Sequence, residues 1–275
     1  MKKNTINLLI FAALAFSFQC MSCKKDQAIN QNAIRTSSSD NIGIHGLPVD
    51  SSLVAWYTFT KGRLNDKSFY HNKIIFCSAS PTVSRNGEDS GAYYFDGSSS
   101  YMSVKNNASL NPVGAISLAA LVKPMGFYQG TCHSNRILNK EYNDVSNGRY
   151  VLGFDDQASY NYTGCFKPVK ENREDFYSTY GNSGASASGV TDTDYIRLGK
   201  WYTVVYTYSN SVSNLYINNK LAISDTISTS FTPNGYDLLI GKSLDPSYPY
   251  YFNGVIDEIR IYNRALSSDE VLGLS

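Results

Sequence analysis

Short strand-like runs recur along this chain from residue 53 to residue 262, and turn residues separate them. No helical periodicity of useful length occurs before Ser267. Strands in such numbers bury their apolar faces in two layers, so the sequence predicts an all-β, two-sheet antiparallel sandwich of the jelly-roll type. The expected strands are residues 53–59, 73–77, 92–95, 101–104, 115–122, 149–154, 201–208, 214–217, 221–224, 237–240 and 253–262.

Two local signals support this interpretation. The dipeptide Asn218-Asn219 separates two strand-like runs, and because Asn tolerates positive φ it predicts a tight hairpin turn. At the C-terminal end, Ser267 and Glu270 have the spacing of a capping box, which predicts a short helix ending near Gly273.

The last expected strand carries an unusual carboxylate. Read at period two, Asp257 shares a face with Val255, Ile259 and Ile261. Burying a lone carboxylate costs several kcal/mol, so Asp257 must gain a cation or hydrogen bonds, or lie where water reaches it. Asp257 is therefore a candidate site residue.

The N-terminus resembles an export signal. Lys2 and Lys3 precede an apolar run at residues 8–18, which is shorter than the roughly 20 residues that a bilayer crossing needs. Ser22-Cys23 then resembles a bacterial lipobox, in which Cys23 becomes lipidated after residues 1–22 are removed; Cys20 fits that pattern less well. The alternative is an ordinary secretory signal with an incidental thiol, and both interpretations place the protein outside the cytoplasm.

The segment 23–50 is rich in Ser, Asn, Gln and Asp, which predicts a flexible tether of about 30 Å root-mean-square length. Residues 51–275 form one expected domain. With a lipidated Cys23, we expect attachment to the bacterial outer membrane, facing the periplasm or exposed at the surface. The formal charge of +1 falls by two when Lys2 and Lys3 are removed, so no basic field for nucleic acid remains.

Six sequence blocks occur in a set order along the chain. They are Ala55-Trp56-Tyr57-Thr58-Phe59, Asn65-Asp66-Lys67-Ser68, Ala92-Tyr93-Tyr94-Phe95-Asp96-Gly97, Ser117-Leu118-Ala119-Ala120-Leu121-Val122-Lys123-Pro124, Gly199-Lys200-Trp201-Tyr202 and the C-terminal strand with its helix. In this order they resemble the LamG-like jelly-roll domains of the concanavalin A-like lectin/glucanase superfamily, and the resemblance covers residues 51–275. It implies a curved two-sheet jelly roll, a ligand face, and often a structural calcium ion.

The resemblance implies Ca²⁺ bound by Asp66 and Asp257, since calcium takes six to eight oxygen ligands. The loop at residues 66–71 departs from the family's usual Asp-x-Ser-Gly-x-Gly, which weakens that assignment. The alternative is a loop-capping or salt-bridge role for each aspartate, with Arg264 available as a partner.

Three cysteines remain after Cys20 and Cys23 are set aside. Cys77 ends an apolar run and resembles a buried thiol. Cys132 and Cys165 lie in polar segments, and outside the cytoplasm a bridge between them is favoured, with a stabilisation of about 4 kcal/mol on a chain-entropy estimate.

Residues 126–189 form the longest expected irregular region, and long ordered loops usually carry function. Aromatic faces beside amides, Arg and carboxylates suit a sugar, because rings stack on its C–H surface while polar groups bind its hydroxyls. The alternative is that these rings only pack loops onto a sheet. The candidate ligand-binding residues are Tyr128, Asn135, Arg136, Asp155, Asp156, Tyr160 and Tyr162.

Signals for catalysis are weaker. The Glu-x-Asp-x-x-Glu pattern of laminarinase-like relatives is absent, and the adjacent Asp257 and Glu258 point to opposite faces of a strand. The three histidines have no zinc-ligand spacing. We therefore expect a non-catalytic cell-envelope module that binds carbohydrate or an extracellular protein. The alternatives are a glycoside hydrolase or lyase with loop-borne carboxylates such as Glu141 and Asp155, and a structural envelope protein.

Overall fold

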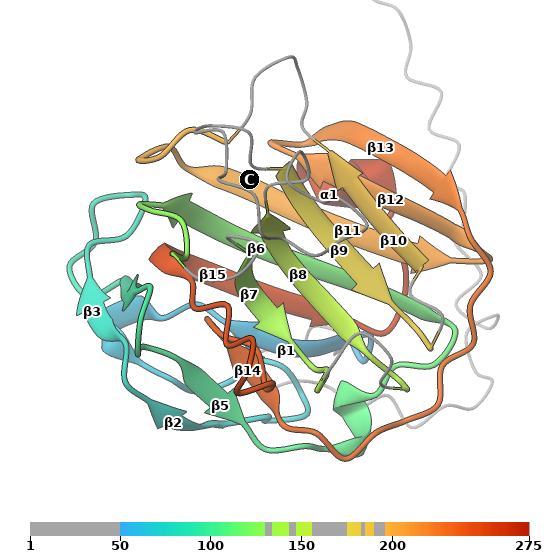
Figure 1. The fold of residues 1–275 in the computed structure, drawn as a ribbon, viewed down its shortest axis with the longest axis horizontal. Helices are drawn as coiled ribbons and strands as arrows, with labels where there is room; N and C mark the ends of the chain where they lie inside the picture. Colours follow the sequence, from blue (N-terminus) through green and yellow to red (C-terminus); the bar gives the residue numbers. More distant parts are fainter. Residues whose placement is uncertain are drawn as a thin grey trace, which may run out of the picture.

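The computed structural model describes residues 50–129, 134–142, 147–155, 175–182, 185–189 and 196–274. In this part of the chain the strands form two antiparallel sheets that face each other, and Figure 1 looks onto the seven-stranded sheet with the eight-stranded sheet behind it. The two-sheet antiparallel sandwich predicted from the sequence is thus confirmed.

The eight-stranded sheet has the order β13-β12-β11-β6-β15-β4-β3, and β1 pairs with β15 beside β4. Its central strands are long because both of their faces are covered. Its members are β1 (Leu53–Tyr57), β3 (Ser80–Thr82), β4 (Ala92–Asp96), β6 (Ala115–Pro124), β11 (Tyr202–Ser209), β12 (Val212–Ile217), β13 (Lys220–Thr226) and β15 (Asn253–Tyr262).

The seven-stranded sheet has the order β10-β9-β8-β7-β14-β5-β2. Its members are β2 (Ile74–Cys77), β5 (Met102–Val104), β7 (Asn135–Asn139), β8 (Tyr150–Asp155), β9 (Asp175–Tyr180), β10 (Ala185–Gly189) and β14 (Leu238–Ile240). Short 3-10 turns, η1 (Thr60–Gly62) and η2 (Ala108–Leu110), and the helix α1 (Ser268–Leu272) complete the described elements.

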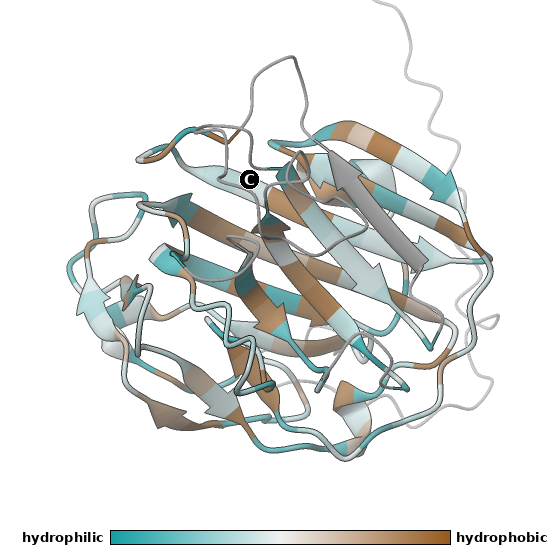
Figure 2. Ribbon diagram, viewed as in Figure 1, coloured by the Kyte–Doolittle hydropathy of each residue, from teal (hydrophilic) through white to brown (hydrophobic). Residues whose placement is uncertain are grey.

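The main core lies between the sheets and takes alternate residues from each. Leu118, Ala120 and Val122 of β6 point into it from one side, and Leu152 and Phe154 of β8 from the other. Figure 2 shows hydrophobic residues along β8, whereas the connecting loops are largely polar. This alternation is the expected signature of strands that pack one face on a core.

A second, smaller cluster covers the outer face of the eight-stranded sheet. Ala119 of β6 and Tyr262 of β15 pack there against Leu266 and against Val271 of α1. β6 is therefore buried on both faces, which explains why its sequence is almost continuously apolar instead of alternating.

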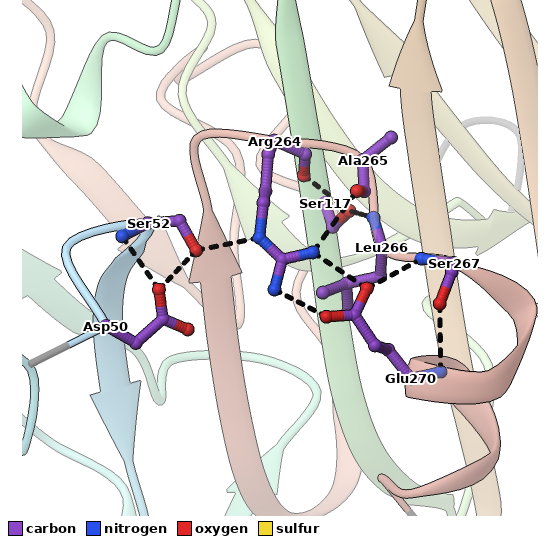
Figure 3. A network of polar contacts seen from close by, with 8 residues as sticks. All are labelled: Asp50, Ser52, Ser117, Arg264, Ala265, Leu266, Ser267 and Glu270. Atoms are coloured by element: carbon purple, nitrogen blue, oxygen red, sulfur yellow. Dashed lines mark hydrogen bonds and ion pairs between the residues drawn. The ribbon is translucent and has the colours of Figure 1, made fainter. Parts of the chain in front are cut away.

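The C-terminal helix is anchored as the sequence predicted. The Ser267 hydroxyl accepts the Glu270 N–H, and Glu270 in turn accepts the Ser267 N–H, so the capping box is confirmed. Arg264 donates to both carboxylate oxygens of Glu270 at 2.7 Å and also to Ser52, next to β1 (Figure 3). Ser117 connects the same turn to β6, because its hydroxyl accepts the Leu266 N–H.

All eleven strands expected from the sequence are present, and the Asn218-Asn219 turn has positive φ at both residues as predicted. Apart from the expected strand at 149–154, which is β8, the expectation of an irregular region at residues 126–189 was wrong, because β7, β9 and β10 also lie within it. β10 reads Ala-Ser-Ala-Ser-Gly, and β9 carries polar residues at its outward positions, so neither has the apolar signal by which a strand is recognised.

The prediction that Asp257 shares the apolar face of β15 was also wrong. On β6, Val122 pairs with Ile256 while the adjacent Leu121 pairs with Glu258, so Asp257 is the extra residue of a β-bulge. The bulge shifts the alternation by one residue and places Ile256 in the core together with Ile259 and Ile261. No helix in the described residues is long and apolar enough to cross a membrane.

Candidate functional site

The segment between β14 and β15, loop 241–252, folds back on itself beside the start of β7. The N–H of Phe252 donates to the carbonyl of Gly241 at 2.9 Å and closes the loop. Phe252 is fully buried and anchors the base. The N–H of Arg136 donates to the carbonyl of Tyr250 at 3.0 Å, which attaches the tip of the loop to β7. These bonds hold the loop's side chains against the seven-stranded sheet.

Tyr250 is the centre of an aromatic cluster on this loop. Its backbone has φ of 43°, a left-handed conformation that is costly for a bulky residue. Its ring centroid lies 5.9 Å from that of Tyr248, in a stacked arrangement, and 6.1 Å from that of Tyr128, edge to face. The guanidinium carbon of Arg136 lies 4.8 Å from the same ring. These contacts offset the cost of the backbone conformation.

Arg136 reaches across the outer face of the sheet because its neighbour has no side chain. Arg136 on β7 pairs with Gly153 on β8, and Gly153 pairs with Tyr177 on β9. A Cβ at Gly153 would collide with the carbonyl oxygen of Asn135 and approach the Tyr177 ring. The guanidinium therefore extends over β8 and lies 5.2 Å from the Tyr177 ring centroid, so that it is held between Tyr177 and Tyr250.

The charge of Arg136 has a buried acidic partner. Arg136 Nη2 lies 3.1 Å from Glu141 Oε1, and Arg149 Nη1 lies 3.6 Å from Glu141 Oε2. The side chains of Arg136 and Glu141 are only 8% and 4% exposed, and a second Arg136 nitrogen donates to the Ser134 hydroxyl. A buried ion pair needs such additional hydrogen bonds to recover its desolvation cost. Glu141 is thus an ion-pair partner of two arginines beneath the aromatic surface.

A second cation lies between two aromatic rings at the first position after Gly241. The ammonium of Lys242 is 4.8 Å from the ring centroid of Tyr101 and 5.1 Å from that of Tyr251. The Tyr101 ring in turn packs on Phe76 at 4.7 Å, and Phe76 on β2 is 45% exposed.

Tyr128 connects the two clusters. Burial raises the pKa of its hydroxyl, and the electrostatic interaction with Tyr251 raises it further. Tyr128 also contacts the Tyr250 ring. The resulting surface, here called the tyrosine strip, comprises Phe76, Tyr101, Tyr128, Tyr248, Tyr250 and Tyr251. Tyr248 is 45% exposed and Tyr128, Tyr250 and Tyr251 are half-buried, so part of the strip is accessible to solvent.

Three of the candidate ligand residues predicted from the sequence do come together at this place. Tyr128 donates its N–H to Asn135 Oδ1 at 3.2 Å, and Arg136 supports Tyr250 as described. Asn135 is fully buried, so it positions Tyr128 from below. Asp155 ends β8 opposite Asp175 of β9.

The remaining predicted residues lie outside the described part of the chain: Asp156, Tyr160, Tyr162, Cys132, Cys165 and Cys23. The Cys132–Cys165 bridge stays a prediction that peptide mass mapping can test. Cys77 is half-buried at the end of β2 against the core, and burial raises the pKa of its thiol.

The sequence analysis missed Lys242, Tyr248, Tyr250 and Tyr251. A signal was available: the segment between two expected strands carries three tyrosines within four residues, next to Pro249. Their proximity to Tyr101 and Tyr128 could not be read from that segment.

The two expected calcium ligands have different surroundings. Asp66 is buried and accepts four hydrogen bonds, from the N–H groups of Trp56, Ser68 and Asn72 and from the Ser68 hydroxyl. These donors occupy about all of the lone-pair positions of a carboxylate, which fits a loop-capping role better than a metal ligand. Asp257 accepts the N–H of Arg85 at 2.7 Å.

Arg264, considered as a partner for these aspartates, instead pairs with Glu270. Within the described residues, no group of three or more His, Cys, Asp or Glu side chains is placed to hold a metal ion. Calcium at Asp66 and Asp257 stays a prediction, and no functional step is derived from it.

Solved structures with a similar fold include both glycan-associated and toxin domains. Domain 4 of AbnA, a GH43 extracellular arabinanase from Geobacillus stearothermophilus in complex with arabinotriose, aligns with a TM-score of 0.55 and 20% identity over 81% of this chain and 98% of that chain. The binding domain of Paraclostridial Mosquitocidal Protein 1 aligns with a TM-score of 0.58 and 14% identity over 81% of this chain and 51% of that chain.

The binding domain of botulinum neurotoxin serotype D aligns with a TM-score of 0.57 and 15% identity over 81% of this chain and 50% of that chain. This chain thus spans about half the length of the two toxin binding domains. At such identities the likeness shows the fold alone. A comparison with curated proteins gave no match.

A family model matches residues 96–272, which is more than half of the chain and includes loop 241–252 with its tyrosines. The chain therefore belongs to the Concanavalin A-like lectin/glucanases superfamily.

Proposed function

We propose that this protein is a non-catalytic binding module that recognises carbohydrate at the tyrosine strip. The observation that carries the proposal is the arrangement of partly exposed rings around Tyr250, fixed from below by Arg136. Sugar rings stack their C–H faces on aromatic side chains, and phenol hydroxyls exchange hydrogen bonds with sugar hydroxyls. A pre-organised set of rings lowers the entropy cost of binding.

The comparisons support binding as a class. The arabinanase domain was solved with arabinotriose, and the toxin domains are named as binding domains. Because these likenesses show the fold alone, the assignment of carbohydrate to this chain rests on the strip.

The proposed location follows from the sequence. A lipid on Cys23 and a tether over residues 24–50 would hold the domain at the bacterial outer membrane, on the periplasmic side or at the surface. An extracellular protein as ligand, or a purely structural envelope role, are the alternatives in that location.

An enzymatic alternative, a glycoside hydrolase or lyase, depends on carboxylates. Glu141 is committed to Arg136 and Arg149, which weakens its use as an acid or base. Asp155 on β8 is paired in register with Asp175 on β9, and it is the other carboxylate on which this alternative depends. Release of reducing ends or unsaturated ends from polysaccharides, lost on Asp155→Asn, would favour this alternative over the binding module.

The binding proposal is tested by substituting Tyr248, whose ring is exposed and stacks on Tyr250. We expect Tyr248→Ala to weaken binding to a glycan found by array screening by about five- to tenfold, since a stacked ring contributes roughly 1 kcal/mol. Tyr248→Phe keeps the ring and should retain most of the affinity. Isothermal titration calorimetry on the processed protein measures both.

Tyr236 provides a matched control. It is 37% exposed and stacks on Tyr142, away from the strip. Tyr236→Ala should leave the affinity unchanged. Equal losses for Tyr236→Ala and Tyr248→Ala, or no loss for Tyr248→Ala, would contradict the assignment of the ligand to the tyrosine strip.

A further inference from the structure

Lys242 is held in place by rings from two distant parts of the chain. Tyr101 precedes β5, whereas Tyr251 lies at the far end of loop 241–252, and the ammonium lies about 5 Å from both ring centroids. Such contacts fix the position of a cation without neutralising its charge. Lys242 as a whole residue is half-buried.

No acidic partner of Lys242 occurs among the described residues. Lys105, Arg136, Arg260 and Arg264 each form an ion pair with a carboxylate, but Lys242 forms none. An ammonium without an acidic partner keeps its full positive charge, so an oxyanion brought by a ligand can form charge-assisted hydrogen bonds with it.

The acids closest in sequence to the strip are used by their own turns. Asp96 accepts three N–H groups, from Ser98, Ser99 and Ser100, and the Ser99 hydroxyl. Asp245 accepts the N–H of Ser247 at 2.8 Å. These hydrogen bonds leave both carboxylates charged, but neither forms an ion pair with Lys242 among the described residues, so the Lys242 ammonium is open to pairing with an anion from a ligand.

We propose that Lys242 selects a glycan with an acidic substituent, in which a carboxylate or sulfate oxygen accepts hydrogen bonds from the ammonium while neighbouring sugar rings stack on Tyr248 and Tyr250. This inference rests on the proposed carbohydrate-binding function and names the chemical class of its ligand. Carboxylated and sulfated glycans share one chemical feature, an oxyanion attached to a sugar ring. A single ammonium is a compact point charge with three donors and accepts either geometry, whereas planar bidentate recognition would call for arginine.

The test compares three oligosaccharide probes of equal length on the processed protein: oligogalacturonate, a sulfated dextran oligomer and a neutral gluco-oligosaccharide. We expect an acidic probe to bind more tightly than the neutral one, with an affinity that falls as salt is added. Lys242→Met keeps the apolar stem and removes the charge, and it should lower the acidic-to-neutral affinity ratio by about three- to tenfold. Lys242→Arg should keep most of the ratio.

Lys123 is the matched control, because its ammonium also lies over one ring, that of Trp201 at 5.2 Å. It belongs to β6 at a position that alternates with the core residue Val122, so its side chain leaves the opposite side of the sandwich. Lys123→Met should leave both affinities unchanged.

An acidic-to-neutral ratio that does not change in Lys242→Met would overturn the inference while the carbohydrate proposal stands. Binding of only the neutral probe by the wild-type protein would likewise overturn the inference and leave the carbohydrate proposal standing. Binding of none of the probes and of no array glycan would instead overturn the proposed function itself. Among positive results, tight binding of oligogalacturonate alone or of the sulfated oligomer alone identifies the anion as carboxylate or sulfate.

Discussion

Arg136 and Lys242 are both cations that lie between two aromatic rings, and they differ in their acidic partners. Arg136 has Glu141 below it, so its charge is balanced inside the protein and its main effect is to hold Tyr177 and Tyr250 in place. Lys242 has no acidic partner among the described residues, so its charge is available to a ligand. We therefore expect substitutions of Arg136 to affect stability first and those of Lys242 to affect ligand selection.

At Asp257, removal of the charge should be stabilising. Burial raises the pKa of this carboxyl above its usual range, although the Arg85 N–H opposes the shift. A raised pKa in the folded state means that folding disfavours the ionised carboxylate. The resulting loss of folding stability is absent below the ordinary aspartate pKa, and it is present in full above the pKa of the folded state. Asp257→Asn should raise the free energy of unfolding at neutral pH by less than about 1 kcal/mol, and should have no effect near pH 3.

The same variant tests the calcium prediction. Denaturant unfolding is measured at both pH values, with added calcium and with EDTA. If calcium is bound by Asp66 and Asp257, EDTA will lower the unfolding midpoint of the wild type and Asp257→Asn will be destabilising in calcium. Asp66→Asn is the comparison: it replaces one of the two carboxylate oxygens with an NH2 group and so removes the acceptor of two of the four hydrogen bonds around a buried group. We therefore expect it to be destabilising under either condition.

At the scale of elements, α1 shows how a helix of only five residues is made stable. Isolated helices of this length do not form in water, so its stability comes from the capping box, the Arg264–Glu270 pair and the packing of Val271 on the outer face of the sheet. The network in Figure 3 also joins the turn before α1 to β6 through Ser117 and to β1 through Ser52.

Glu270→Gln should weaken this element in a pH-dependent way. Hydrogen bonding to Arg264 lowers the pKa of Glu270 to about 2, so its stabilising effect is present above the ordinary glutamate pKa and is lost as the pH falls toward 2. Because the pair is partly exposed, we expect a loss of about 0.5–1 kcal/mol at pH 7 that disappears at low pH. Asp269→Asn, in the same turn, is the control. A loss that is independent of pH would show that the ion pair does not contribute.

At the scale of the whole molecule, the first and last strands are paired. Leu53 of β1 pairs with Tyr262 of β15, and Tyr57 pairs with Ile259. The first strand of the described chain is therefore hydrogen-bonded to the C-terminal half of the last strand. Val54 and Ile261 belong to one core that includes residues of both sheets. The sandwich should therefore unfold as one unit that needs β1 but not the predicted tether.

Two truncations test this organisation. A chain beginning at Leu47 keeps the Asp50–Ser52 contacts and should show the same melting midpoint by circular dichroism as the processed protein. A chain beginning at Phe59 lacks β1, which leaves β15 without its partner on one side from Ile259 to Tyr262 and removes Val54 and Tyr57 from the core. It should therefore lose the cooperative transition. A lower midpoint for the chain beginning at Leu47 would contradict the domain boundary predicted near residue 51.

The sequence by itself determined the features that depend on local geometry. The two-residue periodicity located eleven strands, the Asn218-Asn219 pair located a turn, and the Ser267–Glu270 spacing located a helix cap, because each depends on residues a few positions apart. The sequence also identified Tyr128, Asn135 and Arg136 as candidate ligand residues, although Asn135 and Arg136 proved to lie on the strand β7 and not in a loop.

Only the tertiary structure decided where those residues act. The bulge at Asp257 depends on how β15 pairs with β6, and the position of Arg136 depends on Gly153 of the neighbouring strand. The tyrosine strip joins Phe76, Tyr101 and Tyr128 to the loop between β14 and β15. Such contacts between distant residues follow from strand order and register, which local periodicity does not encode, because a register shift of one residue moves every side chain to the other face.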